Sequence, residues 1–120
     1  MYSMKDIANK YGITQSTIRY YDKEGLLPFT ERTQGGIRYF TDSDIEWLDF
    51  IITLKESGMS VKSIKEYIDN LYNTNNPNKC LDIFKEHKKF LNNQIEIFQK
   101  ALDKVNYTIW ELERQIENKR

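Results

Sequence analysis

The stretch SMKDIANKYGITQSTIRYYDKEG, residues 3–25, decides the fold of this chain. Ser3 followed by Asp6 is a capping-box pattern, and the apolar residues after it recur at helical spacing. The first helix ends at Gly12, where a tight turn needs positive φ. Thr14 predicts the cap of a second short helix, which ends at Gly25. Two short helices joined around a glycine have the spacing of a helix-turn-helix.

The segment that follows, residues 29–40, predicts a β-hairpin. β-branched and aromatic residues flank the pair Gly35 and Gly36, a composition typical of a hairpin turn. A hairpin directly after a helix-turn-helix is a wing, so we expect the first seventy or so residues to form a winged helix-turn-helix.

Two further helices are predicted after the wing. Thr41 or Asp42 caps the third helix, which ends at Gly58, and Ser60 caps the fourth. Their expected inward residues recur at helical spacing: Ile45, Leu48, Ile51, Ile52 and Leu54 in the third, and Val61, Ile64, Tyr67, Ile68 and Leu71 in the fourth.

The last third of the sequence predicts a coiled-coil helix. After the Asn-rich linker 73–78, residues 79–118 follow a heptad pattern without Gly or Pro, interrupted only by Lys88. Such a helix cannot bury its apolar stripe alone, so we expect a second copy to cover it. The predicted dimer interface consists of Leu91, Ile95, Phe98, Leu102, Val105, Ile109 and Leu112. The expected division is therefore a DNA-binding domain over 1–72, the linker 73–78 and a dimerisation helix over 79–118.

Composition gives little support for nucleic-acid binding. The 120 residues carry 18 Lys and Arg against 18 Asp and Glu, whereas nucleic-acid binders often have a basic excess. Residues 1–39 are modestly basic. No apolar run is long enough to span a bilayer, and the N-terminus lacks a secretory pattern. The single Cys80 cannot form a disulfide within the chain, which fits a reducing compartment. We therefore expect a cytoplasmic protein without membrane association.

The outer face of the second helix has the chemistry of a recognition helix. With Ile18 at its buried centre, the exposed residues are hydroxyls, an amide, cations and a phenol: Gln15, Ser16, Thr17, Arg19, Tyr20 and Lys23. Arg and Gln reach base edges, while hydroxyls and Lys contact phosphates. An ordinary solvated helix face is the alternative interpretation of the same pattern.

The run TIRYYDKEGLL, residues 17–27, together with Arg32 and the segment GIRY at 36–39, resembles the MerR family of transcription regulators. The opening residues 2–8, the segment GMSVKSI at 58–64 and the terminal heptads fit the same family. The resemblance implies a mainly α fold: a winged helix-turn-helix head, a small β-hairpin wing and a long C-terminal antiparallel coiled-coil helix.

The resemblance also implies a function. Family members are homodimers that bind double-stranded promoter DNA and distort the spacer between the −35 and −10 elements. RNA polymerase is thus an indirect partner, because the change in the DNA affects how the polymerase engages the promoter. Matching contact positions are Arg19 and Tyr20 on the second helix, Arg38 and Tyr39 in the wing, and Lys62 on the fourth helix. Gln15, Ser16 and Thr17 occupy the variable positions that select the DNA sequence.

An effector is not evident from the sequence. The chain ends with the coil, so we expect no separate effector domain, and an unknown small molecule or redox signal stays possible. One Cys and one His, His87, are too few for a soft-metal site, so neither a metal nor a cofactor is expected. Cys80 opens a helix beside Lys79, which favours a reactive thiol, but a small semi-buried structural residue is the simpler interpretation.

Other functions are weighed against this one. Cys80 and His87 are two helical turns apart, too far for a catalytic pair, so we expect no enzymatic activity. An aromatic cluster of Tyr67, Tyr72, Phe84 and Trp110 is a candidate lining for a small pocket, or simply core. The rival functions are an excisionase-like protein that bends DNA and a coiled-coil adaptor that binds protein.

Overall fold

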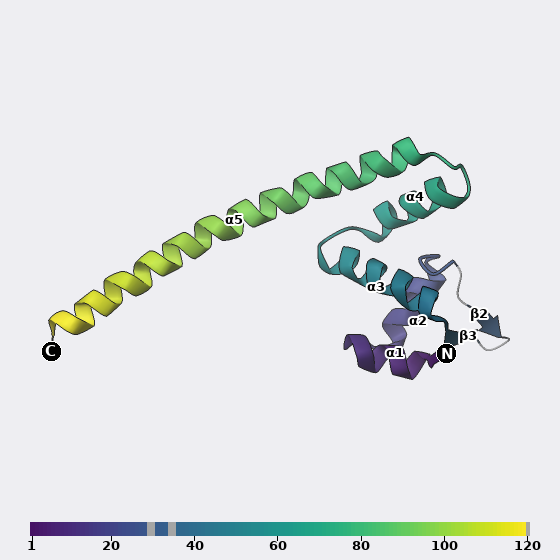
Figure 1. Cartoon of the computed structure of the whole chain (residues 1–120), viewed down its shortest axis with the longest axis horizontal. Helices are drawn as coiled ribbons and strands as arrows, with labels where there is room; N and C mark the ends of the chain where they lie inside the picture. Colours follow the sequence, from purple (N-terminus) through teal and green to yellow (C-terminus); the bar gives the residue numbers. More distant parts are fainter. Residues whose placement is uncertain (29–30, 34–35, 120) are drawn as a thin grey trace. The chain divides into compact units, whose positions relative to one another are not determined.

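The computed structural model describes residues 1–28, 31–33 and 36–119, with the side chains of 31–33 and 36–38 left undescribed. It confirms the mainly α fold with a small hairpin and a long C-terminal helix (Figure 1). The chain divides into two compact units, Met1–Ile83 and Phe84–Arg120. The first unit contains the whole helix-turn-helix and wing.

The first two helices begin at the residues that the sequence marks, and α1 ends at the predicted glycine, whereas α2 ends at Lys23, two residues before the predicted Gly25. Helix α1 (Met4–Tyr11) has a complete capping box between Ser3 and Asp6, and Gly12 ends it with a φ of 65°. Helix α2 (Gln15–Lys23) is capped by Thr14, whose side chain accepts a hydrogen bond from the backbone N–H of Thr17. These caps satisfy amides that a short helix leaves without partners, and they define the angle between the two helices.

The wing belongs to a three-stranded sheet. Strand β3 (Gly36–Phe40) lies between β2 (Glu31–Thr33) and the two-residue strand β1 (Tyr2–Ser3), both antiparallel to it. The hairpin is therefore confirmed, whereas β1 was not predicted because two residues show no periodicity. The predicted turn residue Gly35 lies outside the described residues.

Helices α3 (Asp42–Glu56) and α4 (Val61–Tyr72) complete the head. Thr41 caps α3 through a capping box with Asp44, which explains why the Asp44 carboxylate is buried. Among the expected inward residues of α4, Ile64 and Ile68 are buried. Val61, Tyr67 and Leu71 are only half-buried, because the outer flank of α4 remains open to solvent.

The centre of the head is a tightly buried apolar core. Its largest fully buried side chains are Phe40, Ile7, Ile18, Leu26, Leu27, Leu48, Ile51 and Ile64. Leu26 and Leu27 come from the irregular segment after α2, so helical periodicity did not predict them as core. The indole N–H of Trp47 donates to the carbonyl oxygen of Leu26 at 2.7 Å, which ties this segment to α3.

Helix α5 (Pro77–Asn118) begins two residues earlier than the predicted start at 79. Proline is favourable in the first helical turn because it needs no N–H partner there. The Asn76 side chain accepts a hydrogen bond from the Lys79 N–H at 3.2 Å, which caps the new end. Within the part of the chain that the structure describes, no helix is long and apolar enough to cross a membrane.

Candidate nucleic-acid interface

The outer face of α2 presents the polar side chains predicted to read DNA. Ser16, Arg19, Tyr20 and Lys23 are exposed, with Tyr20 at 48%. Ile18 and Tyr21 are buried on the opposite face, and burial raises the pKa of the Tyr21 hydroxyl above its ordinary value, with a further contribution from Glu56. The helix phase expected from the sequence is therefore confirmed.

Two of the predicted sequence-reading residues contact each other. The Arg19 guanidinium donates to the Oε1 atom of Gln15 at 3.5 Å, one helical turn away. This long, solvent-exposed contact holds Arg19 along the helix face and leaves its other donors available. An Arg fork presented in this way suits the two acceptors of a guanine edge.

Gln15 and Thr17 are half-buried, unlike the other predicted residues of this face. The Thr17 hydroxyl lies 2.9 Å from the hydroxyl of Thr14. The hydroxyl pair belongs to the cap of α2, so Thr17 has less freedom to contact DNA than the exposed Ser16. The sequence pattern placed both residues on the flank and did not separate their roles.

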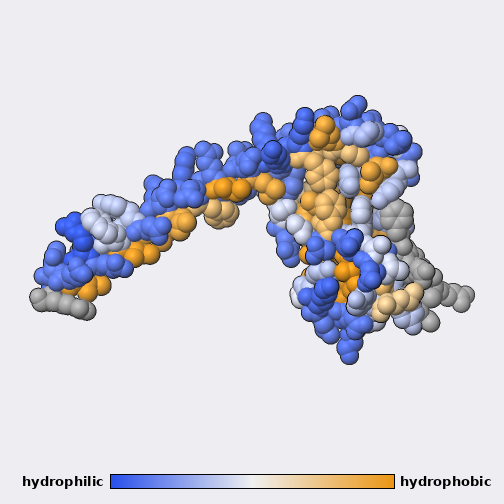
Figure 2. All heavy atoms as spheres, viewed as in Figure 1, coloured by the Kyte–Doolittle hydropathy of each residue, from blue (hydrophilic) through white to orange (hydrophobic). Residues whose placement is uncertain are grey.

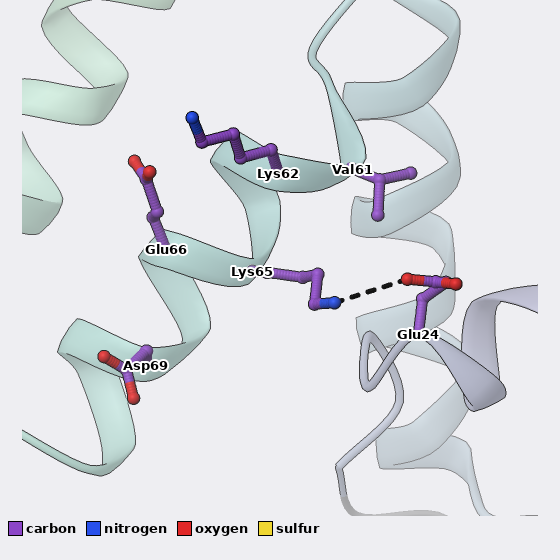
Figure 3. Close-up of a pocket in the computed structure, with 6 residues that line it drawn as sticks. All are labelled: Glu24, Val61, Lys62, Lys65, Glu66 and Asp69. Atoms are coloured by element: carbon purple, nitrogen blue, oxygen red, sulfur yellow. Dashed lines mark hydrogen bonds and ion pairs between the residues drawn. The ribbon is translucent and has the colours of Figure 1, made fainter.

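Contacts behind α2 hold it in place. Glu24, at the end of the helix, forms an ion pair with Lys65 of α4 at 3.3 Å (Figure 3). This cross-helix pair was not predicted, since the two residues are 41 positions apart. Together with the Trp47–Leu26 hydrogen bond, it links the end of α2 and the segment after it to α3 and α4.

Lys62 lies in the first turn of α4 and is exposed. It lines an open pocket of about 490 Å³ together with Glu24, Val61, Lys65, Glu66 and Asp69. Figure 3 shows the Lys62 side chain extending away from the Lys65–Glu24 pair, so the two lysines of this pocket differ in their surroundings. Lys62 is therefore the better candidate for an external anion.

The wing residues are described in part. Tyr39 lies in β3, paired with Ser3 on one side and Glu31 on the other, and is 48% exposed. This exposure favours an outward role over packing against α3. Arg38 also lies in β3, but its side chain is outside the described part, so its predicted phosphate contact stays a prediction.

Cys80 is buried, with 9% of its surface exposed, and its Sγ lies 3.7 Å from the carbonyl oxygen of Tyr67. This position favours a structural residue that fastens the start of α5 to α4. The redox role of Cys80 stays a prediction from the sequence.

The aromatic cluster has a different membership from the one predicted. Trp47 lies 6.3 Å from Tyr67 and 6.2 Å from Tyr72, and Phe50 lies 6.2 Å from Tyr67, measured between ring centroids. Trp110 instead contacts Tyr107 and Arg114 on its own helix. The spacing of Trp47 and Phe50 by three residues on α3 is the sequence signal that would have indicated the true cluster.

The predicted dimer residues form one face of α5. Figure 2 shows the apolar side chains of this helix gathered in a band along one edge. Leu91 is half-buried, whereas the other six predicted residues are exposed, from 48% at Ile109 to 68% at Phe98, and Ile116 continues the band at 58%. An exposed apolar band along several turns of a helix marks an interaction surface.

The chain is similar in sequence to a known family of regulatory proteins. The family model described as MerR HTH family regulatory protein matches residues 2–71. An uncharacterized HTH-type transcriptional regulator of Haemophilus influenzae is 37% identical over 109 residues, covering 90% of this chain and 81% of the relative. The HTH-type transcriptional regulator YyaN of Bacillus subtilis is 36% identical over 119 residues, covering 97% and 83%.

Solved structures agree with these relatives. HiNmlR, described as a MerR family regulator lacking the sensor domain and bound to promoter DNA, has a TM-score of 0.77 at 37% identity, over 90% of this chain and 86% of that one. A MerR family regulator from Bacillus thuringiensis has a TM-score of 0.74 at 32% identity, over 92% and 97%. The relatives are transcriptional regulators and not enzymes. The chain belongs to the MerR family of helix-turn-helix regulatory proteins and is a DNA-binding transcription regulator.

Proposed function

We propose that the protein binds promoter DNA as a homodimer through α2 and the wing, and regulates transcription by distorting the spacer between the −35 and −10 elements, so that RNA polymerase engages both. The observation that carries the DNA-binding part is the exposed polar face of α2, with Arg19 and Tyr20 outward and Ile18 buried behind them. The relative HiNmlR, similar over 90% of this chain and described as bound to promoter DNA, supports the proposal.

The residues divide into two roles. Arg19 and Gln15 contact base edges, with Ser16, Thr17 and Lys23 beside them on the same helix. Tyr20, Arg38, Tyr39 and Lys62 contact phosphates from the recognition helix, the wing and α4. Phosphate contacts on either side of the recognition helix hold a bent duplex, whose deformation costs on the order of several kcal/mol.

The salt dependence of binding tests the proposal. Fluorescence anisotropy of labelled DNA from upstream of the gene, measured across a salt series, should show log-linear weakening, with a slope of about 0.9 for each phosphate neutralised. A scrambled duplex of equal length is the control for specific binding. Absent or salt-insensitive duplex binding would contradict DNA recognition and favour an adaptor that binds protein. In a footprinting experiment, a protected region between the −35 and −10 elements supports spacer distortion. A protected region elsewhere contradicts it.

Arg19→Ala and Lys62→Ala should weaken binding in different ways. Loss of Arg19 should cost about 1–3 kcal/mol on the cognate site and relax discrimination at one base position. Loss of Lys62 should weaken all sequences alike and reduce the salt slope by about 1 per half-site. Lys104→Ala is the control, because it removes the same charge from an exposed position of α5, outside α2, the wing and α4. Uniform weakening by Arg19→Ala would instead assign Arg19 to a phosphate.

A further inference from the structure

A second lysine lies beside the predicted phosphate contact of α4. Lys65 follows Lys62 by three positions, and both line the open pocket of about 490 Å³ that Glu24 closes at the end of α2. We propose, resting on the DNA-binding function above, that Lys65 is a further phosphate ligand and that Glu24 competes with the DNA for it. Lys65 pairs with Glu24 in the unbound protein and with the DNA backbone in the complex.

The two lysines of α4 can reach the same stretch of DNA backbone. Residues three positions apart on a helix are neighbours on its surface, with about 5–6 Å between their Cβ atoms. The ammonium group of a lysine stands at the end of a flexible four-carbon chain, so it can turn from one acceptor to another. A phosphate that Lys62 holds is therefore within the range of Lys65.

The ion pair between Lys65 and Glu24 is of a kind that DNA can displace. The Nζ atom of Lys65 lies 3.3 Å from the Oε2 atom of Glu24, and the two side chains are 51% and 30% exposed (Figure 3). An exposed ion pair adds little net stability, because water and salt compete for both charges. A phosphate of duplex DNA is a stronger competitor, since its neutralisation releases a condensed counterion.

The charges of the pocket favour a phosphate at one end of it. Lys62 lies in the first turn of α4, which contains no acidic residue and has the positive end of the helix dipole. Asp69 lies seven positions later, about 10 Å along the helix at 1.5 Å per residue, and repels an anion there. The exchange leaves the Glu24 carboxylate beside the bound phosphate, so Glu24 lowers the affinity for DNA.

Removing the two partners of the ion pair should have opposite effects on DNA binding. In the full-length protein, Lys65→Ala should weaken binding to cognate and scrambled duplexes by roughly three- to tenfold, and lower the salt slope by about 0.9 for each head. Glu24→Gln should tighten binding by roughly three- to tenfold with little change in slope, because Lys65 no longer leaves a charged partner. Fluorescence anisotropy across a salt series measures both effects.

The double variant separates an exchange of partners from a general effect of charge. In the Lys65→Ala protein, adding Glu24→Gln should tighten binding by less than about twofold, because no lysine is released. Glu66→Gln is the matched control: it is the same substitution in the same pocket, and its effect should be equal with and without Lys65. Equal gains from Glu24→Gln in both backgrounds contradict the exchange. Weakening by both single variants also contradicts it, and indicates a pair that only positions α2.

Lysine acetylation followed by mass spectrometry measures the new contact directly. Lys65 is 51% exposed and should react in the unbound protein, whereas the cognate duplex should protect both Lys62 and Lys65. The exposed Lys104 of α5 should react at the same rate in both states. Unchanged reactivity of Lys65 in a complex that protects Lys62 contradicts the exchange alone. A wild-type protein without salt-dependent duplex binding contradicts the proposed function instead.

Discussion

Ile95→Asp is expected to convert the protein into a monomer and to remove tight binding to a duplex with two half-sites. Ile95 is 65% exposed on α5, so the substitution costs little in a single chain. In the proposed dimer, Ile95 belongs to the apolar band that the second copy covers, so one carboxylate from each copy would enter the seam. At several kcal/mol for each buried ion, the dissociation constant should rise by about a thousandfold or more.

Sedimentation equilibrium and anisotropy with one-site and two-site duplexes measure these effects. The variant should bind both duplexes with the weak affinity of one head, because the second contact is no longer intramolecular. Asn93→Asp is the control, since it adds the same charge at an exposed position off the seam. A dimer that persists in Ile95→Asp would show that the apolar band is not the dimer interface.

Phe40→Ala is expected to destabilise the DNA-binding head by about 3–5 kcal/mol. Phe40 is fully buried at the end of β3, a strand that contacts both α1 and α3. Truncation leaves a cavity where the wing, the first helix and the third helix meet. A loss of this size is a large part of the 5–15 kcal/mol typical of small proteins.

Urea denaturation followed by circular dichroism measures the change. Phe40→Leu should recover most of the stability, because it keeps most of the volume. The neighbouring Tyr39→Ala should change the free energy of unfolding by less than about 1 kcal/mol, since Tyr39 is half-exposed. Equal losses from Phe40→Ala and Tyr39→Ala would contradict the assignment of Phe40 to the core.

The sequence by itself determined where helices α1 to α4 begin, whereas α5 begins two residues before its predicted start. Ser3, Thr14, Thr41 and Ser60 each cap a helix, and Gly12 takes the positive φ expected of it. These signals act within one helical turn, so the local sequence contains all the information they need. The periodicity of α2 likewise predicted its buried and exposed faces, and that of α5 predicted that its apolar residues share one face, because helical geometry follows from sequence position alone.

The tertiary structure decided how those elements meet. Strand β1 exists only because β3 lies beside it, and Leu26 and Leu27 are core only because α3 covers them. The Glu24–Lys65 ion pair joins residues 41 positions apart, and Trp47 with Phe50 replaced Trp110 in the aromatic cluster. Each of these contacts joins segments that are distant in the sequence. Packing of the whole core brings such segments together, so no local sequence pattern predicts the contact. The polar outer face of α2 was therefore evident from the sequence, and the contacts that link the end of this helix to the head came only from the fold.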